Sequence, residues 1–199
     1  TLLCHKKEKP LSVPIISLNT NEKLSFSFDD LDGDFKKYFY TIIHCSSQWE
    51  KSDLIESEYI NGFYKKEITD YKFSFNTLQK YTHYKFDFPE NNLEPILSGN
   101  YIFKIFEEGQ SDNPIILHRF MVLENKVNIE PNVKMATLFS DRKTKHEIDF
   151  LIKPFDLEIR NPYSEIKVKL TQNNNDNNSI ENLRPIFIKN NQLIYDYED

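Results

Sequence analysis

The chain has 199 residues, a net charge of −6 and 14% aromatic residues. The sequence has no lysine- or arginine-rich stripe, which argues against extended contact with nucleic-acid phosphates or with an anionic membrane. No apolar run approaches the ~18 residues that a membrane-spanning helix requires, so direct membrane insertion is not expected. The aromatic and β-branched residues occur in short runs, which favours strands over helices.

The first 125 residues show the period of two that is typical of β-strands. Leu24, Phe26 and Phe28 alternate with serines, and the run at residues 38–45 is apolar on both faces, as in a central strand. Turn-forming residues such as those at 29–34 separate the runs. Strands are predicted at residues 24–28, 38–45, 71–75, 84–88, 101–106 and 115–123. Residues 1–125 are therefore predicted to form an immunoglobulin- or fibronectin-like β-sandwich in a nearly all-β protein.

Residues 126–199 carry shorter apolar runs separated by longer polar connections. The tract at 173–178, which holds five asparagines and one aspartate, is predicted to be a mobile tip between two strands. Strands are expected at residues 127–129, 148–152, 166–170, 186–188 and 193–197. This pattern predicts a small or incomplete second β-sandwich, and we expect the natural protein to continue past Asp199.

An acidic turn raises the question of a metal site. Asp30, Asp32 and Asp34 are candidate calcium ligands, because hard cations bind clustered carboxylates. The spacing of a calcium-binding helix–loop–helix motif fails, because Phe35 stands where that motif requires glycine and Thr41 where it requires glutamate. The favoured interpretation is an acidic turn between two strands, without a metal or cofactor.

Catalytic motifs are missing from the sequence. His44 and Cys45 are adjacent in a predicted strand, so their side chains point to opposite faces and cannot act as a pair. The four glycines are dispersed and form no phosphate-binding loop, and no nucleophile elbow is present. We therefore expect a protein that is not an enzyme and has no small-molecule substrate.

One segment suggests binding. Trp49, Tyr59, Phe63 and Tyr64 lie in a loop-like stretch at residues 46–66, where a short helical turn is also conceivable. Aromatic side chains outside a regular alternation anchor partners or stack on sugars. They also close the end of a sandwich, and the sequence favours this second role without settling it.

A series of segments in a fixed order resembles a known family. The segments are 14–16, 28–34, 40–45, Trp49, 58–63, Tyr71, 74–77, 81–84, Pro89, 97–101, 119–122, 161–163 and 195–197. Together they resemble the N-terminal region of the plug protein of the type 9 secretion system of Bacteroidota. Each segment alone is weak, and the order of the series makes the match specific.

The resemblance implies a periplasmic protein that closes the periplasmic mouth of the giant outer-membrane β-barrel translocon. It supplies no catalytic residues, and it implies a chain longer than this one. The alternative is a periplasmic glycan-binding module that uses Trp49, Tyr59 and Tyr64 as an exposed stacking platform. Exposed rings would favour the glycan module, and buried rings would favour the plug.

Overall fold

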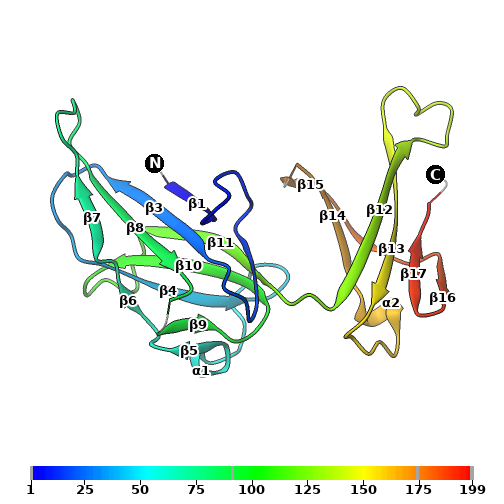
Figure 1. Ribbon diagram of the computed structural model, residues 1–199, viewed down its shortest axis with the longest axis horizontal. Helices are drawn as coiled ribbons and strands as arrows, with labels where there is room; N and C mark the ends of the chain where they lie inside the picture. Colours follow the sequence, from blue (N-terminus) through cyan, green and yellow to red (C-terminus); the bar gives the residue numbers. More distant parts are fainter. Residues whose placement is uncertain (1, 91, 174, 198–199) are drawn as a thin grey trace. The chain divides into compact units, whose positions relative to one another are not determined.

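The computed structural model describes residues 2–90, 92–173 and 175–197. It is nearly all β, with 52% strand and 4% helix, which confirms the predicted fold class. The chain separates into two compact units, Thr1–Glu124 and Asn125–Asp199 (Figure 1).

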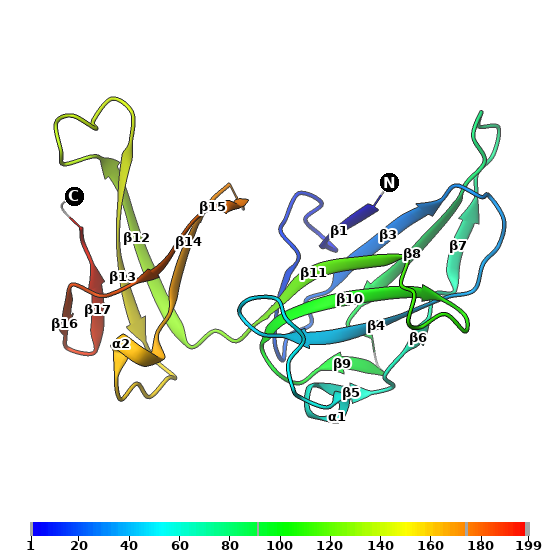
Figure 2. The same ribbon diagram turned by 180° about the vertical axis from the view of Figure 1, so that it is seen from behind.

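The first unit is a sandwich of two mainly antiparallel sheets, in which β2 runs parallel to its neighbour β11. One sheet has the order β1 (Leu2–Lys6), β3 (Leu24–Asp30), β8 (Thr82–Phe88), β7 (Asp70–Phe73). The other has the order β2 (Ile15–Ser17), β11 (Ile116–Leu123), β10 (Gly99–Glu107), β4 (Tyr38–Cys45), β6 (Lys66–Glu67). The helical turn α1 (Glu56–Tyr59) and the short pair β5 (Ile60–Gly62) and β9 (Leu93–Pro95) close one end (Figure 2).

Aromatic rings from both sheets fill the space between them. Alternate residues of β3, β8 and β10 point inward and are buried, as the period of two predicts. Phe103 stacks on Phe120 with ring centroids 4.2 Å apart, and Tyr40 stacks on Phe86 at the same distance. Each such pair contributes about 0.5–1.5 kcal/mol beyond the burial of its area. The core is therefore continuous across the two layers.

The second unit has a four-stranded sheet and a separate hairpin. The sheet has the order β12 (Val127–Met135), β13 (His146–Pro154), β17 (Gln192–Tyr195), β16 (Phe187–Lys189). The hairpin pairs β14 (Val168–Gln172) with β15 (Asn175–Leu183), and the turn α2 (Pro162–Glu165) precedes it. Phe150, Ile152, Leu193 and Tyr195 form the buried core.

Two predictions for the second unit were wrong in their bounds. The predicted tip is shorter than the polar tract, since Asn173 lies in the turn after β14 but residues 175–178 belong to β15; residue 174 lies outside the described residues. Asn175 pairs with Gln172, and the register shifts before Leu170 pairs with Ile180, so the side chains of residues 175–178 stay exposed. β12 also runs six residues further than predicted, through Pro131, because an edge strand tolerates proline.

Candidate docking surface

The β7–β8 hairpin extends beyond the rest of the first unit (Figures 1 and 2). Among the described residues β7 pairs with β8 alone, which places Tyr71 opposite Tyr84 and Phe73 opposite Thr82. Tyr84 and Thr82 are fully buried, whereas Tyr71 and Phe73 are exposed. Tyr71 and Phe73 thus lie on the same face of the sheet as the buried Tyr84 and Thr82. The opposite sheet does not cover them, because β7 is at the edge.

Six exposed apolar side chains gather around this hairpin. We call them the tip patch: Leu31, Phe35, Tyr71, Phe73, Phe75 and Leu78. Phe75 is 90% exposed and Leu78 is fully exposed. Phe35 contacts Tyr71 with ring centroids 4.8 Å apart, and Tyr71 contacts Phe73 at 5.6 Å. Apolar groups that cluster on a surface mark sites of contact with other macromolecules, whereas isolated ones do not.

The acidic turn braces the hairpin. Gly33 has a φ of +74°, and a Cβ there would lie 2.8 Å from the Cβ of Lys80, so both the conformation and the close approach favour glycine. The Gln79 amide donates to the carbonyl of Leu31 at 3.0 Å, and the Thr82 hydroxyl donates to the carbonyl of Asp34 at 2.9 Å. The turn and the hairpin therefore hold each other in position.

Two of the three candidate calcium ligands in this turn, Asp30 and Asp32, bind a lysine. The Lys36 ammonium lies 3.1 Å from Asp30 Oδ2 and also contacts Asp32. The Tyr38 hydroxyl donates to Asp30 at 2.9 Å. Burial opposes ionisation of Asp30, but hydrogen bonds from the Asp32 N–H, Tyr38 and Lys36 outweigh it and lower its pKa. Asp30 and Asp32 therefore already have a cationic partner.

The loop aromatics do not form one exposed platform. Tyr59 is buried and lies 6.1 Å from Tyr101, between ring centroids, where it closes one end of the sandwich. The Arg119 guanidinium lies over the Trp49 ring, 4.7 Å from its centroid. Phe63 and Tyr64 are exposed. The burial of Tyr59 removes one of the three rings on which the glycan-binding interpretation depends.

A second carboxylate cluster lies in the other unit. Oxygens of Glu147, Asp149 and Asp196 lie within 4.8 Å of one another. The Lys134 ammonium lies 3.0 Å from Glu147 and 2.7 Å from Asp149. Hydrogen bonds from Thr137, together with Lys134, lower the pKa of Glu147 to about 2. Lys134 on β12 thus pairs with two of the three carboxylates and ties β12 to β13.

The thiols are poor nucleophiles. Cys4 and Cys45 are both free. Burial raises the pKa of Cys4 to about 12, and burial also raises the pKa of Cys45. A thiol protonated at neutral pH does not support nucleophilic catalysis.

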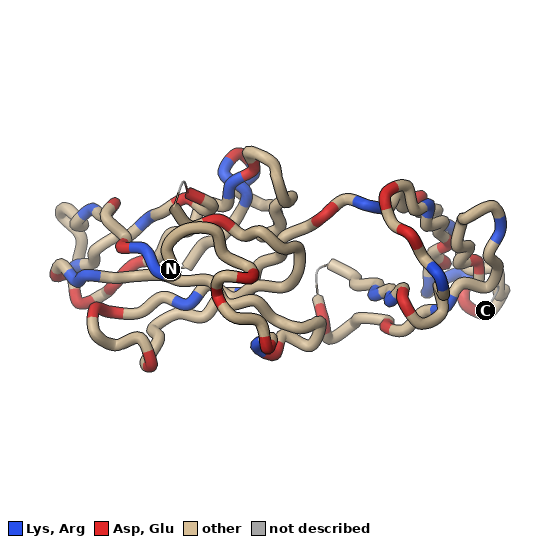
Figure 3. The backbone as a smooth tube through the Cα atoms, turned by 90° about the horizontal axis from the view of Figure 1, so that it is seen from below, with Lys and Arg blue, Asp and Glu red and all other residues tan. Residues whose placement is uncertain are grey.

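Charges of both signs are interspersed along the backbone (Figure 3), and the described residues include no helix with the length and hydrophobicity of a membrane span. The first unit thus defines a class: an all-β sandwich that presents a braced, exposed apolar surface. Residues 1–124 match the first domain of the type 9 secretion system plug protein, so the chain belongs to this family. The resemblance predicted from the sequence is confirmed.

Comparison with solved structures supports the fold. A hypothetical protein from Parabacteroides merdae is 30% identical, with a TM-score of 0.92 over 99% of this chain. The match covers 50% of that protein, so this chain spans about half of its length. An alkylpurine DNA glycosylase from Pseudomonas fluorescens, at 10% identity over 61% of this chain and 30% of its own, has a TM-score of 0.27, too low to indicate a shared fold. No curated protein matches the chain.

Proposed function

We propose that the protein is a non-enzymatic periplasmic plug, which binds and seals the periplasmic mouth of the outer-membrane β-barrel translocon of the type 9 secretion system. The observation that carries this proposal is the family match over residues 1–124, the unit that bears the tip patch. The partner surface is accordingly the rim of the translocon, and the tip patch is the contact.

A preformed surface suits a seal. The patch stands on the β7–β8 hairpin, which pairs with β3 through β8 and is braced by the acidic turn, so little conformational entropy is lost on docking. A flexible segment would lose ordering free energy on binding and would seal less tightly.

The surroundings of the patch suit a reversible contact. Exposed charged side chains of Asp70, Lys72 and Lys80 flank the apolar groups. An apolar centre with a polar rim is typical of interfaces between proteins that also exist apart. A plug has to leave the pore when secretion begins, and this composition allows it.

Paired substitutions on exposed residues test the contact. The double variant Phe75→Ser/Leu78→Ser should fold normally and bind the purified translocon at least about tenfold more weakly, since buried aromatic anchors dominate interface energies. Leu11→Ser is the matched control, because Leu11 is as fully exposed as Leu78 but lies outside the tip patch. Equal binding by the double variant and the control would exclude the tip patch as the contact.

Permeability tests the seal itself. Cells that lack the protein should admit large hydrophilic antibiotics, and deleting the translocon as well should remove this leak. Complementation with Leu11→Ser should restore the barrier, and complementation with the double variant should not. A leak that persists without the translocon would contradict the plug function.

A further inference from the structure

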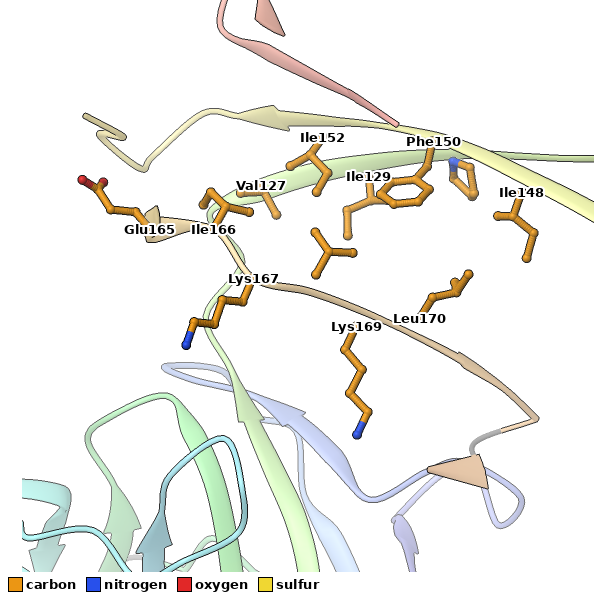
Figure 4. A pocket seen from close by; sticks show the side chains of 12 residues that line it. Val127, Ile129, Ile148, Phe150, Ile152, Glu165, Ile166, Lys167, Lys169 and Leu170 are labelled. Carbon is orange, nitrogen blue, oxygen red and sulfur yellow. The ribbon is translucent and has the colours of Figure 1, made fainter. Parts of the chain in front are cut away.

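The second unit contains an open apolar groove of about 460 Å³. Its two walls are the inner face of the β12–β13 sheet and the strand β14. We call this pocket the open groove; its apolar lining includes Ile129, Phe150, Ile152, Ile166, Val168 and Leu170. Figure 4 shows Ile166 and Leu170 directed toward the sheet, whereas Lys167 and Lys169 point away from it.

The groove exists because the two layers have different widths. Four strands form one layer, and the hairpin β14–β15 forms the other. One cross-strand row of the sheet is Ile129, Ile152, Leu193 and Ile188. Ile152 is 5% exposed and Leu193 is 1% exposed, but Ile129 on the edge strand β12 is 55% exposed. The hairpin layer therefore lacks a strand next to β14 that would cover β12.

The edge of β14 can accept that strand. β14 pairs with β15 alone in the described part of the chain, so its other edge has unpaired backbone donors and acceptors. A strand added there would alternate its side chains as β14 does, one set into the groove and the other beside the lysines. The groove-facing set has to be apolar.

The charges around β14 indicate which side chains the second set, beside the lysines, should have. Lys169 is paired with Asp176 and Glu181, and the Glu165 carboxylate accepts hydrogen bonds from the backbone N–H groups of Arg160 and Asn161. Lys167 makes no ion pair with the described residues. An acidic residue opposite Lys167 would complement it, because opposite charges across strands attract. A second copy paired through its own β14 would bring lysines together, which disfavours self-association.

We propose that the open groove binds an extended strand of a partner protein, in which apolar residues alternate with acidic residues and which adds to the free edge of β14. This inference does not depend on the plug function, since it concerns the other unit and rests on its burial and charge alone.

A labelled peptide tests it. A nine-residue peptide of alternating valine and glutamate should bind the intact 199-residue chain saturably in a fluorescence-anisotropy titration. A peptide of alternating valine and lysine should bind at least about fivefold more weakly, and a peptide with the same valines and glutamates in blocks should not bind. Absence of saturable binding, or equal binding of the block peptide, would overturn the proposal.

Three variants locate the site. Ile129→Lys should weaken binding of the valine–glutamate peptide at least tenfold, because it places a charge in the groove. Ile188→Lys is the matched control: it lies in the same row and on the opposite edge strand, is 42% exposed, and should leave affinity within twofold. Lys167→Glu should reverse the preference between the two alternating peptides, a result that a merely structural role cannot produce. Unchanged preference would overturn the charge assignment.

Circular dichroism melting confirms that each variant folds. Sedimentation velocity of the intact chain tests whether a second copy of the chain, and not a partner strand, occupies the groove. A concentration-dependent dimer that Ile129→Lys abolishes would identify a second copy as the natural occupant and overturn the proposal. A monomer at all concentrations, together with peptide binding, supports it.

Discussion

The two units bury their strands to very different extents. In the first unit a four-stranded sheet faces a five-stranded sheet, and 19 described residues form its buried cluster. In the second unit a four-stranded sheet faces a hairpin, and 4 described residues form its buried cluster. Since burial of apolar area is the main stabilising term, matched layer widths make the first unit the more stable one. The single tryptophan, Trp49, lies in the first unit and reports it selectively.

The largest expected effect follows from the core of the first unit. Phe103 is fully buried between the sheets, with ring centroids 4.2 Å from Phe120 and 5.0 Å from Phe88. Phe103→Ala should lower the free energy of unfolding of this unit by about 3–5 kcal/mol. The Trp49 fluorescence transition in urea should move accordingly, while an earlier far-UV circular dichroism phase, from the second unit, should stay in place. Coincident transitions in the parent chain would show that the units unfold together.

A pH titration sharpens the comparison for the second unit. The pKa of Glu147 is lowered to about 2, below its ordinary value of 4.5. A carboxylate with a lowered folded-state pKa stabilises the protein above the unfolded value and loses this contribution as the pH falls through the folded value. The early urea phase should therefore weaken between about pH 5 and pH 2. Glu147→Gln should flatten that dependence, and an unchanged slope in this variant would refute the role of Glu147.

Calcium should have a small effect on either unit. A ligand that binds only the folded state raises the melting temperature by mass action. The carboxylates of Asp30 and Asp32 already hold Lys36, so millimolar calcium should shift melting by no more than a few degrees. A larger rise that EDTA reverses would show that the acidic turn binds the metal.

The smallest stability effect is expected at the tip patch. Leu78 is fully exposed, so Leu78→Ser should change the free energy of unfolding by no more than about 0.5 kcal/mol. The Trp49 transition measures this directly. A large loss of stability would mean that the tip belongs to the fold and not to a docking surface.

The sequence predicted where strands begin and end better than it predicted which strands lie side by side in the sheets. β4 has the predicted bounds, Tyr38–Cys45, because a run of aromatic and β-branched residues is a local signal. The tip patch was missed, because Tyr71 and Phe73 alternate in the same way as core residues do. Whether the opposite sheet covers them depends on which strand lies at its edge, which is a non-local property. An apolar Leu78 within a turn was the signal that could have revealed the tip.

β15 and the open groove were missed for related reasons. β15 begins within the asparagine-rich tract and pairs with β14 at Asn175, Ile180, Glu181 and Leu183, and side-chain polarity does not report backbone pairing. The groove depends on the number of strands in each layer, and a sequence shows strands without showing their layers. Tyr59, in contrast, occupies the sandwich-closing position that the favoured sequence interpretation gave it.

Pro131 gives β12 a further property. It leaves this outer strand one backbone donor short, and the strand at the opposite margin of the sheet, β16, has only three residues. Neither margin is a good template for stacking copies of the chain side by side into filaments. Repeated copies of the chain are therefore not expected to polymerise through the two margins of this sheet.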